Sequence, residues 1–93
     1  MYSEASIERR LKKEVEKIGG KALKFVSPGT TGVPDRMVLL PGGRMFFVEL
    51  KAPGKELRAL QQLRKKQLEK LGFKVLVIDT VEKIQQFIEE VVL

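Results

Sequence analysis

The stretch 73–79 constrains the fold most, because nearly every residue in it is apolar. A short run this apolar is typical of a strand that is buried on both faces, as in a parallel sheet. Residues 57–71, just before it, form a strongly charged amphipathic pattern that ends at Gly72, which predicts a helix. A helix between two strands is long enough for a right-handed crossover, so the strands on either side of it should be parallel.

The rest of the chain supplies the partners of that strand. Turn residues and hydrophobic periodicity predict a helix over 3–20 capped by Ser3, a strand over 21–26, a hairpin of strands 36–40 and 44–51, and a last helix capped by Thr80. The expected order is helix, three strands, helix, strand, helix. We therefore predict an α/β fold with a mixed β-sheet flanked by helices, and a single domain over residues 1–93.

Composition excludes several kinds of chemistry. The chain of 93 residues has no cysteine and no histidine, so disulfides, zinc sites and histidine-based nucleophilic triads are ruled out. Any metal must be a hard cation held by oxygen atoms. The net charge of +6 favours a polyanionic partner such as nucleic acid, although many small proteins are basic for solubility alone. No apolar run approaches the roughly 20 residues that span a bilayer, so we expect no membrane association.

The predicted strand 44–51 carries the most informative side chains. Alternation places Met45, Phe47, Glu49 and Lys51 on one face, so an acid and a lysine continue an otherwise apolar surface. Burying a carboxylate costs several kcal/mol, roughly, unless it is paired or bound to a metal. A simple Glu49–Lys51 ion pair at the strand end would satisfy this requirement.

Asp35 makes a metal site the better explanation. It opens the other strand of the predicted hairpin, so Asp35 and Glu49 can lie side by side at one end of the sheet. Two adjacent carboxylates repel each other unless a divalent cation lies between them, and magnesium binds through one or two carboxylates together with phosphate and water. Lys51, on the same face, could then orient the attacking water and neutralise charge that develops on the phosphate. Taken alone, Asp35 could also be an ordinary loop-end residue.

These residues resemble a known signature. Pro34-Asp35 followed by Glu49-Leu50-Lys51 is similar to the motif of the PD-(D/E)XK nuclease superfamily, which has the restriction-endonuclease-like fold. The segments 24–29, 32–35 and 48–54, with a glutamine early in the next helix, resemble the VRR-NUC (virus-type replication-repair nuclease) family. The similarity extends over nearly the whole chain and is closest to short stand-alone members from phages and bacteria.

The resemblance implies roles for individual residues. Asp35 and Glu49 match the metal-binding acids, the Leu50 backbone carbonyl matches a further metal ligand, and Lys51 matches the catalytic lysine. The implied cofactor is Mg²⁺ or Mn²⁺. Gln61 matches the family glutamine, and a polar amide on the apolar stripe of its helix would independently need a partner.

The family also has an acid in its first helix. Glu8 matches it by spacing from Gly19-Gly20, whereas Glu4 lies nearer the middle of the apolar stripe. In the first turn, however, Glu4 could simply complement the helix dipole. We predict Glu8 as this acid, with Glu4 as the alternative.

Basic side chains on or near the first and second predicted helices are candidate phosphate contacts: Lys55, Arg58, Lys65, Lys66, Arg9 and Lys13. From the resemblance we expect a homodimeric endonuclease that cuts branched DNA such as four-way (Holliday) junctions, in the cytoplasm of a bacterial or phage-infected cell. The alternatives are a flap or single-strand nuclease of phage replication or repair, and a non-catalytic DNA-binding module that retains the fold.

Overall fold

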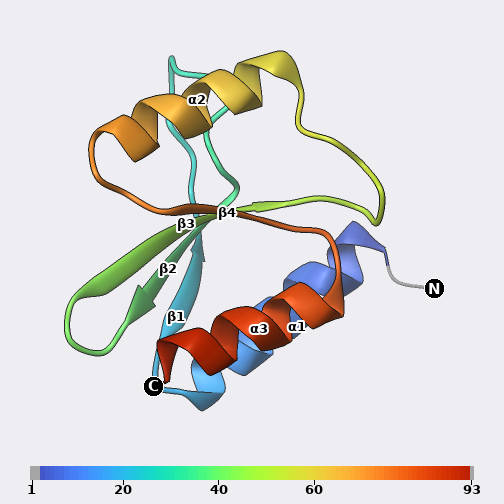
Figure 1. The fold of residues 1–93 in the computed structure, drawn as a ribbon, viewed down its shortest axis with the longest axis vertical. Coiled ribbons are helices and arrows are strands. Elements are labelled where there is room, and N and C mark those ends of the chain that lie inside the picture. The colour runs from blue at the N-terminus through green and yellow to red at the C-terminus, as the bar shows by residue number, and fades with distance from the viewer. Residues whose placement is uncertain (1–2, 93) are drawn as a thin grey trace.

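The computed structural model describes residues 3–92 (Figure 1). It contains three helices and four strands: α1 (Glu4–Lys17), β1 (Lys21–Lys24), β2 (Arg36–Leu40), β3 (Arg44–Leu50), α2 (Ala59–Lys70), β4 (Val75–Ile78) and α3 (Val81–Val91). This order is the one that the sequence predicts. Over this part of the chain, no helix is both long enough and apolar enough to cross a bilayer.

The four strands form one mixed sheet in the order β1-β2-β3-β4. β1, β2 and β3 pair in antiparallel fashion, and β2 and β3 are the predicted hairpin. β4 returns through α2 and pairs parallel to β3, with Glu49 opposite Val77. The predicted crossover is therefore confirmed, and it places the ends of β3 and β4 at the same edge of the sheet.

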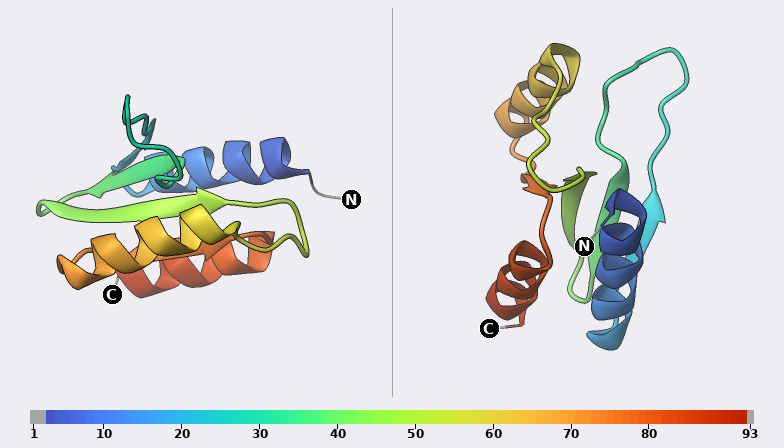
Figure 2. Two further views of the ribbon diagram at one scale, coloured as in Figure 1. Left: turned by 90° about the horizontal axis from the view of Figure 1, so that it is seen from above. Right: turned by 90° about the vertical axis from the view of Figure 1, so that its right-hand side faces the viewer.

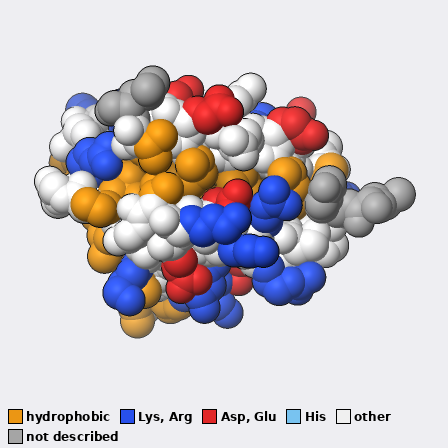
Figure 3. Space-filling model, turned by 90° about the horizontal axis from the view of Figure 1, so that it is seen from below, with side chains coloured by type: hydrophobic (Ala, Val, Ile, Leu, Met, Phe, Trp, Pro, Cys, Tyr) orange, Lys and Arg blue, Asp and Glu red, His pale blue; other side chains and the backbone are white. Residues whose placement is uncertain are grey.

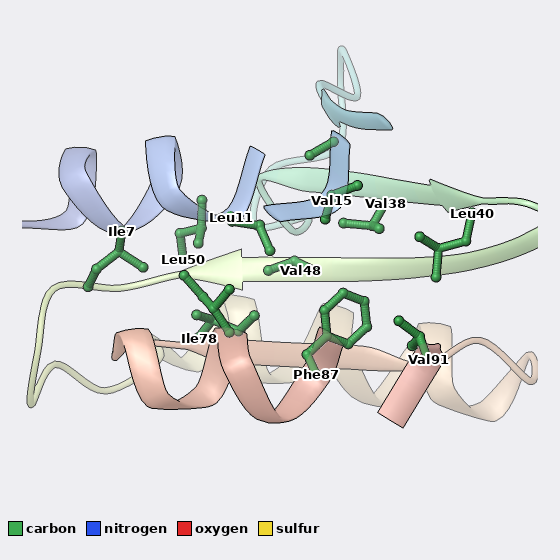
Figure 4. Close-up of a cluster of buried hydrophobic side chains, with 12 residues drawn as sticks. Ile7, Leu11, Val15, Val38, Leu40, Val48, Leu50, Ile78, Phe87 and Val91 are labelled. Atoms are coloured by element: carbon green, nitrogen blue, oxygen red, sulfur yellow. The ribbon is translucent and has the colours of Figure 1, made fainter. Parts of the chain in front are cut away.

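One face of the sheet is covered by α1 and α3, which lie side by side (Figure 2). Ser3 and Thr80 cap these helices through their side chains, as predicted. The core between helices and sheet is made of Ile7, Leu11, Val15, Val38, Leu40, Val48, Leu50, Ile78, Ile84, Phe87 and Val91, together with Ala22 (Figure 4). These strand residues alternate with side chains that point to the opposite face, and that opposite face carries Glu49.

The prediction that residues 73–79 form a strand buried on both faces is confirmed only in part. β4 is an edge strand, in which Val75 and Ile78 are buried but Leu76 and Val77 are only half-buried. Phe73 precedes the strand and remains 42% exposed. The physical reason is that β4 has a neighbouring strand on one side only, so side chains on both of its faces stay partly open toward the free edge. Each face of β4 therefore buries one residue, Val75 beside Phe47 on the face that carries Glu49 and Ile78 beside Leu50 on the core face.

Candidate active site

Asp35 and Glu49 lie opposite each other at one end of the sheet. Asp35 directly precedes Arg36, which pairs with Val48, so the antiparallel register brings Asp35 opposite Glu49. The Leu50 backbone N–H donates to Asp35 Oδ2 at 3.0 Å, and the Phe25 N–H donates to the Asp35 carbonyl at 2.8 Å. The sequence prediction that the hairpin would bring these two acids together is confirmed by this geometry.

Glu49 is a buried carboxyl group, with only 2% of its surface exposed. Its burial, followed by a hydrogen bond with the Asp35 carboxyl and the negative charge of Asp35, raises the pKa of Glu49 to about 8. The positive charge of Lys51 acts in the opposite direction. In the absence of a cation, the acid pair therefore holds a proton near neutral pH.

Gln61 connects α2 to the acid pair. Its Nε2 donates to Glu49 Oε1 at 3.3 Å, and its Oε1 accepts from the Arg58 N–H at 2.9 Å. Both ends of the amide are therefore engaged, which fixes its orientation toward Glu49. The neighbouring Gln62 instead donates to the Leu57 carbonyl, as expected from its different direction on the helix. The choice of Gln61 over Gln62 from helical periodicity agrees with these contacts.

Lys51 and the Leu50 carbonyl lie just beyond the pair, where β3 ends. The Lys51 N–H donates to the Ile78 carbonyl at 3.0 Å, which ties the end of β3 to the end of β4. The Lys51 side chain is half-buried, and its charge acts on Glu49. The strand therefore presents an acid, a backbone carbonyl and a lysine in succession at one edge.

Arg36 also belongs to the surroundings of the site, a role that was not predicted from the sequence. It is only 8% exposed, its Nη1 donates to the Ala22 carbonyl at 3.0 Å, and its Nη2 forms an ion pair with Glu8. The signal in the sequence was an arginine at a core-facing position of a strand, alternating with Val38 and Leu40. Such a residue needs a buried partner, and here the partner is Glu8.

The first-helix acids are therefore in different situations. Glu8 is engaged by Arg36, whereas the negative charge of Glu4 contributes to the raised pKa of Glu49. Both line one concave region together with Asp35 and Arg36. The assignment of Glu8 by spacing stays a prediction, and Glu4 stays the alternative because its charge contributes, as the smallest cause, to the raised pKa of Glu49.

The residues at this edge fit a hard divalent cation. Two adjacent carboxyl groups, one of them with a strongly raised pKa, are the arrangement that a bound cation would relieve. Among residues 3–92, no group of three or more acidic side chains could hold an ion by itself. A cation here would therefore depend on Asp35, Glu49, the Leu50 carbonyl, water and an external ligand, which is the coordination that magnesium commonly adopts.

The residues predicted to contact DNA fall into two groups on opposite sides of the sheet. Lys55, Lys65 and Lys66 line one concavity beside α2, and Arg58 lines another on the far side of that helix. Arg9 and Lys13 are exposed on α1, which covers the other face of the sheet. Figure 3 looks at the layer of α1 and α3 from outside and shows Lys and Arg side chains gathered over part of it.

Comparison with known proteins finds similar proteins in both sequence and structure. A protein of Acyrthosiphon pisum secondary endosymbiont phage 1, named "Putative nuclease p44", is 53% identical over 80 residues, which are 86% of each chain. A solved structure described as "VRR_NUC domain" superposes with a TM-score of 0.87 at 29% identity and covers 92% of this chain and 94% of its own. No family model matches the sequence.

Proposed function

The chain belongs to the VRR-NUC family of nucleases, and we propose that it is a metal-dependent, structure-specific endonuclease that hydrolyses phosphodiester bonds in branched DNA such as four-way junctions. The observation that carries this proposal is the pairing of Asp35 with the buried Glu49 beside Lys51. Burying Glu49 beside the half-buried Asp35 is costly for stability and is reasonable where the two acids serve a ligand.

The metal in this proposal is Mg²⁺ or Mn²⁺. Asp35, Glu49 and the Leu50 carbonyl would hold it, and it would supply Lewis-acid stabilisation of the phosphate and a more acidic bound water. Gln61 keeps one Glu49 oxygen in place through its amide and thereby limits the orientations of that carboxylate. Glu8, or Glu4 in its place, would complete the acidic side of the site from α1.

Lys51 is the proposed catalytic lysine. It would orient the attacking water and neutralise the charge that develops on the phosphate. It follows the Leu50 carbonyl at the end of β3, and its ammonium group can donate to a water or to a non-bridging phosphate oxygen. Because the backbone N–H of Lys51 is held by the Ile78 carbonyl, the side chain starts from a fixed point at the sheet edge.

The proposed substrate is branched DNA, and the proposed active form is a homodimer. Residues 1–93 would act as a single nuclease domain, and a two-fold dimer would present two acid pairs to the two symmetric strands of a junction. The small sheet leaves its second face incompletely covered, with Leu23 45% exposed and Phe73 42% exposed, which is compatible with self-association.

The test is cleavage of a synthetic four-way junction in Mg²⁺ or Mn²⁺, beside flap, single-strand and linear duplex substrates. We expect paired cuts in the junction by the wild type, with a loss of about 100-fold or more in rate for Lys51→Ala at preserved DNA binding. Lys21→Ala, an exposed lysine at the other end of the sheet, is the matched control and should cut normally.

Two outcomes would change the proposal. If the flap or single strand is cut in preference to the junction, the substrate is wrong and the chemistry stands. If no DNA is cut with either metal and Lys51→Ala behaves like the wild type, the chain is a non-catalytic DNA-binding module.

A further inference from the structure

A pocket of about 440 Å³ opens directly beside the acid pair. Its walls are residues 31–33 of the loop before β2, and Arg58, Leu60 and Gln61 at the start of α2, with Asp35 at its inner end. This volume lies within the range of roughly 300–1,000 Å³ that is typical of small-ligand sites. Because Asp35 and Gln61 belong to both the pocket and the acid site, whatever enters the pocket lies next to the reacting group.

The two walls of the pocket are held together by specific contacts. Arg64 Nε donates to the Thr31 carbonyl at 2.8 Å, which ties α2 to the loop. Gly32 packs so closely on α2 that a Cβ atom there would lie 2.7 Å from Leu60 Cγ. Gly32 also has a φ of +85°, a conformation that other residues adopt at a cost. The shape of the pocket therefore depends on glycine at position 32, and any larger residue there would disturb it.

The chemistry of the walls suits one nucleotide. Val33 and Leu60 offer apolar surface, and Leu60 remains 39% exposed beside Gly32. Arg58 adds a planar cation that can stack on a base or bind a phosphate. In a continuous duplex the bases are stacked and paired, so only an unstacked base can reach such a concavity.

We propose that this pocket receives the base of one unstacked nucleotide next to the scissile phosphate. The proposal rests on the proposed nuclease function and explains how a chain of this size could distinguish branched from linear DNA without reading sequence. Val33 and Leu60 contact the faces of the base, and Arg58 contacts the adjacent phosphate. DNA with unstacked nucleotides at a branch point fills the pocket, and a regular duplex leaves it empty.

A scan of the substrate tests the proposal without altering the pocket. Junctions that carry a single abasic analogue at successive positions around the mapped cut are bound to the Lys51→Ala variant, and binding is measured by fluorescence anisotropy. We expect one position beside the cut to weaken binding by about 5- to 100-fold, as expected for the loss of a base contact, and the other positions to have little effect. If all positions behave alike while the wild type still cuts the junction, the pocket proposal fails and the nuclease proposal stands.

A pair of variants tests the same point from the protein side. Leu60→Trp fills the pocket, whereas Leu63→Trp adds the same bulk on α2 outside it, at a side chain that is 46% exposed. We expect Leu60→Trp to abolish the preference for junction over duplex DNA, and Leu63→Trp to retain it. Val33→Trp fills the pocket from the loop and replaces Leu60→Trp if that variant unfolds. Retained preference in a folded pocket-filling variant would overturn the proposal.

Discussion

The carboxyl group of Glu49 is subject to opposing influences from the residues around it. Its burial and the neighbouring Asp35 favour the protonated form, whereas Lys51 favours the ionised form, and the result is a pKa of about 8. The same side chain in the unfolded chain titrates near 4.5. Between these two values, the folded protein without metal binds a proton that the unfolded chain has released.

This difference predicts how stability depends on pH. In this window the folded state binds more protons than the unfolded state. The contribution of Glu49 to the free energy of unfolding of the metal-free protein should therefore be greatest below about pH 4.5 and should fall as the pH rises toward 8. Thermal unfolding in a chelating buffer measures it. The lowered pKa values of Glu14 and Asp79 act only at more acidic pH, so the window from 5 to 8 isolates Glu49.

Two controls accompany this measurement. Glu49→Gln should remove most of the fall in stability between pH 5 and 8. Mn²⁺ should raise the stability of the wild type most at the alkaline end, where Glu49 is more easily ionised. An unchanged pH profile in Glu49→Gln would show that another group causes the dependence.

The two acids of α1 should separate in their effects. Glu8→Gln removes the charged partner of the buried Arg36, and we expect it to lower the free energy of unfolding by about 1–3 kcal/mol. Glu4→Gln should leave the metal-free protein nearly as stable, while weakening Mn²⁺ affinity by roughly tenfold, as for residues near a metal site. Thermal unfolding without metal measures the stability of each variant, and the shift of the melting temperature on adding Mn²⁺ measures its response to the metal. If Glu8→Gln reduces the metal response at unchanged stability, the acid assigned by spacing is the right one.

Among the elements, those set by local patterns could be predicted and those set by distant contacts could not. α1, α3 and the hairpin follow from caps, periodicity and a Gly-Gly turn, and the hairpin alone is enough to bring Asp35 to Glu49. The pairing of Arg36 with Glu8 joins residues 28 apart along the chain, so no local pattern could indicate it. The edge position of β4 likewise follows from the order of the strands in the sheet, which periodicity does not report.

α2 should be the least stable helix. It buries none of its residues, its N-cap residue Arg58 makes no cap hydrogen bond through its side chain, and it contacts the loop through Arg64 and Gly32. We expect its amide hydrogens to exchange at least about tenfold faster than those of α1 and α3. Arg64→Ala should increase exchange in α2 and in residues 31–33 together, whereas Lys70→Ala in the last turn should not. Equal protection of all three helices would contradict this reasoning.

At the scale of the whole molecule, the sheet separates a layer of two helices, α1 and α3, from a layer that contains only α2. α1 and α3 enclose the core on one face, and α2 lies across the face that carries Glu49 (Figures 1 and 2). Positive charge is present on both layers, yet Glu49 faces the α2 layer, and the α1 layer borders the site with the acidic residues Glu4 and Glu8. DNA that reaches Glu49 must therefore approach on the α2 side, so the basic residues of the two layers should not contribute equally.

The salt dependence of binding can measure this asymmetry. In a Lys51→Ala background, the logarithm of the affinity for a four-way junction should fall linearly with the logarithm of salt concentration, by about 0.9 for each phosphate contact. We expect Lys65→Ala/Lys66→Ala to reduce that slope by roughly 1 to 2, and Arg9→Ala/Lys13→Ala, which removes the same charge from α1, to leave it nearly unchanged. An equal reduction by both pairs would mean that DNA contacts both layers. In a dimer, this would require the α1 layer of one protomer to lie along the junction arm that is cut by its partner.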